Sequence, residues 1–120
     1  MATPGTFTPI AVAPAYVGTG IGTLYTAGAN GAIIDYINLT NVIGTASRVA
    51  SIYYVIGGGT AGGSNLIAGT TFTIPADTLP VNVLENLAGR PFHMAGTSTL
   101  QGTVSAASEI VCHIGGVDYS

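Results

Sequence analysis

Glycine and proline interrupt this chain so often that no uninterrupted stretch suits a long helix. The sequence contains 18 Gly and 6 Pro, and they separate short runs rich in Val, Ile, Thr and Tyr, which favour strands. Several runs show the two-residue alternation of a strand with one buried face, most clearly residues 48–56, 98–105 and 109–117. About seven or eight such strands at regular spacing predict an all-β fold, an antiparallel β-sandwich or a jelly-roll-like barrel.

The alternation also assigns side chains to the two faces of a strand. In residues 109–117, one face carries Ile110, Cys112 and Ile114, whereas His113 lies on the other. We expect the apolar face to be buried against a second sheet. His113 is therefore interpreted as a solvent-side or interface residue of its strand.

The first 20 residues differ from the rest of the chain. Pro4, Pro9 and Pro14 recur there at regular intervals, and each proline fixes φ and removes a backbone donor. We therefore expect an extended N-terminal arm over residues 1–20 and a β-sandwich domain over residues 21–120. An extended apolar segment can add to the edge of a neighbouring subunit's sheet through main-chain hydrogen bonds, so the arm is interpreted as a strap between subunits.

The charge of the chain is low for a protein of its size. Only 6% of its residues are charged, with no Lys, and the net charge is −3 at pH 7. Ordinary soluble domains carry about a quarter charged residues, so little charge repulsion keeps copies of this chain apart. We therefore expect a homo-oligomer that packs against other subunits. Nucleic-acid binding needs clustered Lys and Arg, so we expect no nucleic-acid partner.

The apolar stretches are too short to predict a membrane span. A spanning helix needs about 20 consecutive apolar residues, whereas Gly, Thr, Pro and Asn interrupt each hydrophobic run here. The N-terminus lacks the basic and apolar regions of a secretion signal, so we expect synthesis in a cytoplasm and no membrane partner. Cys112 is the single cysteine. With no basic residue near it in the sequence, a small core residue is favoured over a nucleophile.

The stretch GGGTAGG, residues 57–63, raises the question of a nucleotide site. Gly57, Gly59 and Gly62 follow the G-x-G-x-x-G spacing of a dinucleotide-binding turn. Such a turn holds the pyrophosphate at the N-terminus of the helix that follows it. Here the sequence continues as GSNLIAGTTFTIP, which interrupts any helix. We therefore predict a glycine-rich hairpin connection with positive φ, and no cofactor.

Side chains suited to catalysis are present but scattered. His93, His113, Ser105 and Asp118 include the residue types of a hydrolase triad, but none lies in a nucleophile elbow or another catalytic motif. A metal site built on both histidines would need two further ligands from a sparse set of acids. We therefore expect no catalytic residue, no metal-binding residue and no enzyme activity.

Three segments carry a characteristic order of strands and turns. They read TLYTAGANGAIIDYINLTN, SIYYVIGGGTAGGSNLIAGTTFTIPAD and AGTSTLQGTVSAASEIVCHIGGV. In this order the chain resembles a family of small virion proteins of tailed bacteriophages, of decorating or unassigned role. The resemblance covers about residues 23–117, nearly everything except the arm, and rests on turn and core positions rather than on a chemical signature.

The resemblance implies a β-sandwich that attaches to a capsid or a tail. From it we expect a capsid decoration, or cement, protein located in the virion, with the major capsid protein as its partner. Because junctions between shell proteins are often threefold, we expect a homotrimer. The alternative is a tail or fibre component that binds a host surface, where a sugar site needs an aromatic platform beside polar side chains. A small enzyme is the third class considered.

Aromatic and apolar residues toward the two ends of the chain are the candidate contacts with other subunits. Tyrosine is enriched at protein interfaces because it offers a large apolar area with a polar tip. The apolar side chains of the arm join this set. The candidate interface residues are Phe7, Ile10, Val12, Tyr16, Val17 and Tyr119.

Overall fold

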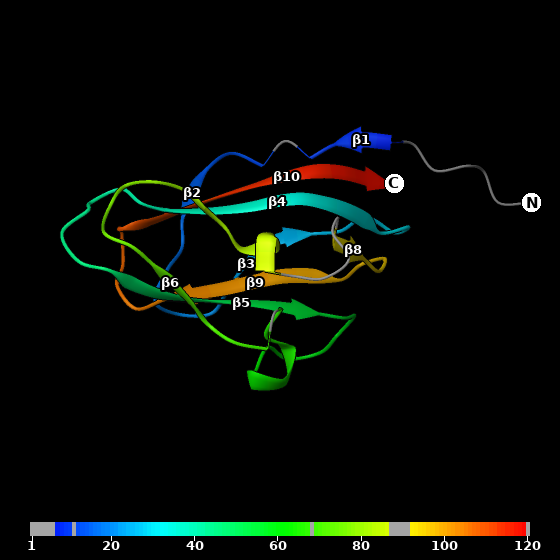
Figure 1. Ribbon diagram of the computed structural model, residues 1–120. Coiled ribbons are helices and arrows are strands. Elements are labelled where there is room, and N and C mark those ends of the chain that lie inside the picture. The colour runs from blue at the N-terminus through cyan, green and yellow to red at the C-terminus, as the bar shows by residue number, and fades with distance from the viewer. Residues whose placement is uncertain (1–6, 11, 68, 87–91, 120) are drawn as a thin grey trace, which may run out of the picture.

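The protein folds into two antiparallel β-sheets that pack face to face. The computed structural model describes residues 7–10, 12–67, 69–86 and 92–119. Figure 1 shows the two sheets as stacked layers of long strands. The all-β sandwich predicted from the strand pattern is therefore confirmed.

The first sheet, sheet A, is built on two long strands. These strands, β4 (Ala32–Asn41) and β10 (Ile110–Tyr119), pair antiparallel over almost their whole length. Short strands complete both edges of the sheet. On the β10 side they are β1 (Phe7–Pro9) and β2 (Ala15–Tyr16), and on the β4 side they are β7 (Val81–Asn82) and β8 (Phe92–Met94).

The second sheet, sheet B, has the order β3-β9-β5-β6. Its strands are β3 (Gly22–Thr26), β5 (Arg48–Val55), β6 (Phe72–Ile74) and β9 (Thr99–Val104). Leu66 forms a further bridge with Tyr53 and extends the β6 side of β5. Because β6 is short, this bridge protects more of the backbone edge of β5.

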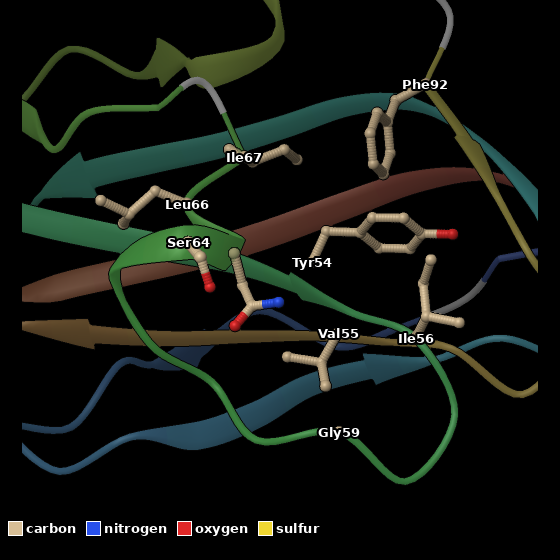
Figure 2. A pocket seen from close by; sticks show the side chains of 9 residues that line it. Tyr54, Val55, Ile56, Gly59, Ser64, Leu66, Ile67 and Phe92 are labelled. Carbon is tan, nitrogen blue, oxygen red and sulfur yellow. The ribbon is translucent and has the colours of Figure 1, made fainter.

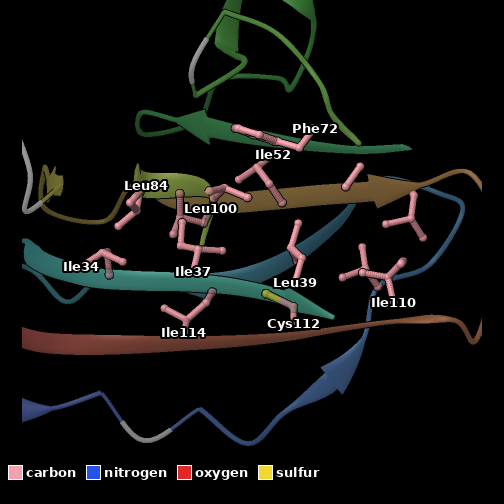
Figure 3. Packing of buried hydrophobic residues seen from close by; sticks show 14 of the residues in the cluster. Ile34, Ile37, Leu39, Ile52, Phe72, Leu84, Leu100, Ile110, Cys112 and Ile114 are labelled. Atoms are coloured by element: carbon pink, nitrogen blue, oxygen red, sulfur yellow. The ribbon is translucent and has the colours of Figure 1, made fainter. Parts of the chain in front are cut away.

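The core lies between the sheets and consists of alternate residues of the long strands. On β10, Ile110 and Ile114 are 0% and 1% exposed, whereas His113 between them is exposed, so the predicted faces of this strand are confirmed. Figure 3 shows Ile37 and Leu39 of β4 facing the side chains of sheet B across the gap. Each fully buried aliphatic side chain contributes about 1.5–3 kcal/mol relative to exposure, so this layer holds the two sheets together.

A β-bulge interrupts the pairing of β4 with β10 next to Gly115. Asp35 is the extra residue of β4 and has no partner on β10, so Ile34 and Ile37 on either side both face the core. The ring of Tyr36 covers Gly115, and a Cβ at that glycine would overlap the ring. An aromatic side chain that covers a cross-strand glycine compensates for the missing side chain in the sheet.

Residues 7–10 and 12–17, which we call the N-terminal segment, lie along the β10 edge of sheet A, in the sandwich of their own chain. β1 pairs with residues 117–119 and β2 with residues 111–112, and the Val17 N–H donates to the Ile110 carbonyl at 2.9 Å. Without this segment β10 would expose a row of unpaired backbone groups, and proline is tolerated in an edge strand. The described part of the segment is extended, and its strands β1 and β2 pair with β10 of the same chain.

The sandwich has two flanks, where an edge of sheet A meets an edge of sheet B. On the first flank the N-terminal segment faces β3 across a crevice of about 100 Å³. On the second flank Phe92 of β8 contacts Tyr54 of β5. The strand orders place β1, β2 and β3 on one flank and β6, β7 and β8 on the other, so the two flanks lie on opposite sides of the molecule.

Candidate functional site

The glycine-rich stretch 57–63 connects two strands of sheet B. It leads from β5 into η1 (Gly63–Asn65), a single 3-10 turn, and the chain then reaches β6, which pairs antiparallel with β5. Gly58 has φ +72°, a conformation that glycine adopts without strain. The predicted glycine-rich hairpin connection with positive φ is therefore confirmed. A dinucleotide turn leads directly into a helix that holds the pyrophosphate, whereas this connection continues into a strand.

A cavity of about 370 Å³ opens beside this connection on the second flank. Figure 2 shows Tyr54 and Phe92 on one side of the cavity and Ser64 and Leu66 on the other. The end of β5, the turn η1 and strand β8 thus build it from three separate parts of the sequence. Its lining residues, none of which is charged, are Tyr54, Val55, Ile56, Gly59, Ser64, Asn65, Leu66, Ile67 and Phe92.

The aromatic side of the cavity is an edge-to-face pair. The rings of Tyr54 and Phe92 have centroids 5.0 Å apart and an interplanar angle of 87°. The Tyr54 hydroxyl accepts a hydrogen bond of 2.7 Å from the Ala95 N–H. This bond anchors the tip of the tyrosine while its ring borders the cavity, so the aromatic surface has a defined orientation.

The side chains of sheet A that point away from sheet B form a second notable surface, which we call the outer face. Directly paired residues of neighbouring strands share a side of the sheet, so the register identifies its members. None of the paired members is Lys, Arg, Asp or Glu, but Asp35, the unpaired residue of β4 at the bulge, is exposed and adds one negative charge beside Tyr36. The members are Phe7, Pro9, Tyr16, Ile33, Tyr36, Asn38, Thr40, Asn82, His93, Val111, His113, Gly115, Val117 and Tyr119.

The two histidines lie on the outer face but apart from each other. His113 lies opposite Asn38, and its ring meets Tyr36 edge to face with centroids 5.3 Å apart. His93 lies opposite Ile33, which is about 13 Å from Asn38 along β4 when the bulge is discounted. The histidines therefore cannot share one metal ion. In the part of the chain that the structure describes, no three His, Cys, Asp or Glu residues group to hold a metal.

Ser105 and Asp118 lie at opposite ends of the sandwich, and each side chain accepts hydrogen bonds there. The Ser105 hydroxyl accepts a hydrogen bond of 3.0 Å from the Val49 N–H. The Asp118 carboxylate accepts one of 3.0 Å from the Gly28 N–H and another from the Tyr25 hydroxyl. Burial, and then the bond to Asp118, raise the pKa of Tyr25 above its ordinary value. The structure therefore does not bring the residue types of a hydrolase triad together.

Cys112 is a core residue, as predicted. It is 6% exposed on the inner face of β10 and belongs to the hydrophobic core. Burial raises the pKa of its thiol to about 12, because a thiolate is poorly solvated in apolar surroundings. The thiol is therefore protonated at neutral pH and is not an activated nucleophile.

Three of the candidate interface residues lie on the outer face. Phe7 is 67% exposed and Tyr16 is 56% exposed. The ring of Tyr119 meets that of Phe7 edge to face, with centroids 4.7 Å apart. The edge strands β1 and β2 thus place large aromatic side chains where another subunit can contact them.

The other three candidates pack within their own chain. Ile10 is half-buried against the core, and Val12 is half-buried at the crevice of the first flank. Val17 is 1% exposed and is part of the core of its own chain. Its N–H donates a hydrogen bond to the Ile110 carbonyl of β10 at the end of the N-terminal segment, and its side chain packs between the sheets.

Sequence reasoning missed the cavity on the second flank. Tyr54 lies in the predicted strand 48–56, Asn65 follows the glycine-rich stretch 57–63, and Phe92 belongs to no sequence motif. These residues meet only because the edges of the two sheets meet. Strand periodicity gives the face of each residue but not the neighbouring edge.

A comparison of the chain with protein-family models, curated proteins and solved structures finds no match to any of them. No helix in the described part of the chain is long and apolar enough to cross a membrane. Two surfaces of the described chain are suited to binding, namely the outer face of sheet A and the cavity on the second flank.

Proposed function

We propose that the protein is a structural component of a tailed-bacteriophage virion, a decoration or cement protein that binds the assembled capsid shell. The observation that carries this proposal is the outer face of sheet A, which combines exposed aromatic residues with neutral polar ones. The centres of protein interfaces are enriched in aromatic residues and depleted of charge. The resemblance of the strand order to small virion proteins supports the same role.

The N-terminal segment supplies the most exposed aromatic side chains for such a contact. Phe7 and Tyr16 project from β1 and β2, with 67% and 56% of their surfaces exposed, and Val111 lies beside Tyr16 on β10. Apolar burial is the main driving force when such residues associate. Because ionic strength screens charge pairs but hardly changes apolar burial, binding through this face is expected to persist at high salt.

One ion pair lies apart from this face, whereas the exposed Asp35 at the bulge of β4 borders it. The Arg48 guanidinium forms an ion pair with Glu109, with an Nη2 to Oε1 distance of 3.1 Å, at the start of β5 and away from the face. The two opposite charges neutralise each other locally. A shell protein that docks on the outer face therefore does not have to desolvate this pair.

A cement role follows from mass action. A subunit that binds the assembled shell better than the separated shell proteins stabilises the assembly in proportion to its occupancy. We propose that the subunits act as homotrimers at threefold junctions between copies of the major capsid protein. The N-terminal segment contributes through the aromatic residues it presents, since its described backbone is already paired with β10.

The test is co-sedimentation of the purified chain with shells that lack it, at low and at high salt. We expect near-stoichiometric binding at both salt concentrations and a higher temperature of DNA release. Tyr16→Asp places a charge in the contact and should weaken binding at least about tenfold. The matched control is Thr73→Asp, an exposed position on β6 of sheet B, which should leave binding unchanged.

Loss of binding in both variants, or in neither, would contradict docking through the outer face. The copy number of the chain in purified particles, measured by quantitative mass spectrometry, separates the remaining roles. Near-stoichiometric copies relative to the shell protein support decoration of the capsid. A few copies per particle support the tail or fibre alternative, and absence from particles removes the virion role.

A further inference from the structure

We propose that the cavity on the second flank binds an uncharged saccharide, with a sugar ring against Tyr54 and Phe92 and its hydroxyls on Ser64 and Asn65. This inference goes beyond the proposed shell contact and does not depend on it. It concerns a different surface, built by β5, η1 and β8 instead of the outer face.

The size of the cavity suits a small ligand. Its volume of about 370 Å³ falls within the range of about 300–1,000 Å³ that is usual for small-molecule sites. It lies on the second flank, where the β8 edge of sheet A meets the β6 edge of sheet B. Because it opens at the side of the sandwich, a ligand reaches it without displacing a core residue.

The lining combines the two kinds of contact that a sugar ring needs. A pyranose presents C–H groups, slightly positive in charge, on its faces and hydroxyl groups around its rim. An aromatic face is electron-rich and attracts such C–H groups. In the edge-to-face pair of Tyr54 and Phe92 (Figure 2), the edge of one ring points at the face of the other. The two faces of the first ring therefore do not contact the second ring.

The polar side of the cavity has hydrogen-bonding groups that the turn itself does not use. The Asn65 N–H donates to the Gly62 carbonyl at 2.9 Å and closes η1 through the backbone. Asn65 and Ser64 both line the cavity. A carboxamide both donates and accepts, and so does a hydroxyl, which matches the hydroxyl groups of a sugar.

The absence of charge in the lining selects among ligands. None of the nine lining residues is Asp, Glu, His, Lys or Arg, and the chain has a net charge of −3. A phosphorylated or acidic sugar would lose hydration without gaining a cation, which is unfavourable. The site is therefore assigned to a neutral hexose or N-acetylhexosamine unit.

The position of the cavity leaves it accessible when the outer face is covered. The N-terminal segment lies on the first flank, and η1 lies beyond sheet B in Figure 1, on the far side from β10. A subunit docked through sheet A would thus present the cavity away from the shell. Many copies on one particle would raise the avidity of weak individual sites.

The test is saturation-transfer NMR with the full chain and separate neutral probes. These probes are methyl glucoside, methyl galactoside, methyl mannoside and N-acetylglucosamine; glucuronate is the acidic control and octanoate the apolar control. We expect transfer to the ring C–H protons of at least one neutral sugar, with a millimolar dissociation constant. Asn65→Ala and Ser64→Ala should each weaken binding by about tenfold.

The matched control is Asn38→Ala, which removes an asparagine from the outer face and should leave sugar binding unchanged. Thermal unfolding of each variant shows whether the fold is kept. The proposal is overturned if no neutral sugar binds at millimolar concentration, if octanoate binds in place of the sugars, or if Asn65→Ala and Ser64→Ala bind as the native chain does. Shell binding does not enter this assay, so either proposal can fail alone.

Discussion

The buried thiol of Cys112 predicts a specific loss of stability in alkali. Its pKa lies near 9 in an unfolded chain and is raised to about 12 by burial on β10. Between these values the folded chain keeps the proton and the unfolded chain releases it. Stability is therefore fully present below pH about 9 and falls as the pH rises toward 12. At pH 10 the unfolded state gains about 1.4 kcal/mol from this ionisation.

Urea unfolding at pH 8 and pH 10, under reducing conditions, measures this term. The free energy of unfolding of a small domain changes by about 1–3 kcal/mol per molar urea. Ionisation of this thiol in the unfolded chain should therefore lower the urea concentration at the unfolding midpoint by about 0.5–1.4 M between pH 8 and pH 10. Cys112→Ala is the matched variant, since it removes the thiol and leaves the other titrating groups. Its loss of stability between the two pH values should be smaller by about 1.4 kcal/mol. An equal loss in both proteins would refute the assignment of a buried, protonated thiol.

Three further perturbations test the fold. Gly115→Ala should lower the free energy of unfolding in urea by about 1–3 kcal/mol, because the new Cβ overlaps the Tyr36 ring. In a Tyr36→Ala background this loss should be smaller, and additive effects of the two substitutions would contradict the contact. Leu39→Ala should cost about 2–5 kcal/mol in thermal unfolding, since Leu39 is 0% exposed, and a cost below about 1 kcal/mol would contradict its place in the core. Deletion of residues 1–17 should expose the β10 edge and increase self-association in sedimentation, whereas an unchanged monomer fraction would show that the edge needs no cover.

The strands that the sequence predicts best are those with one solvent-exposed face and one buried face. In residues 109–117 the alternation alone identified Ile110 and Ile114 as buried and His113 as exposed, and the structure confirms this. A half-buried strand must alternate, because successive side chains point to opposite faces. The local pattern is then sufficient to find the sandwich class and most of its inner face.

The N-terminal segment shows what local pattern cannot give. Its prolines correctly indicated extended backbone, but the partner of Phe7 is Tyr119, at the other end of the sequence. No local feature distinguishes a segment that pairs with its own chain from one that pairs with a neighbour. The cavity was missed for the same reason, since Tyr54 and Phe92 belong to different sheets and meet only through tertiary packing.

The pairing of β1 with β10 has a consequence for how the chain reaches this structure. During synthesis β1 leaves the ribosome before any other strand described, and its partner β10 leaves after all of them. Pairings of such long sequence separation form slowly, because a large loop must close first. Until then the early segment is available to the β10 of a second nascent chain, which is the route to strand exchange. The concentration of chains during folding should therefore decide whether this edge closes within one subunit or between two.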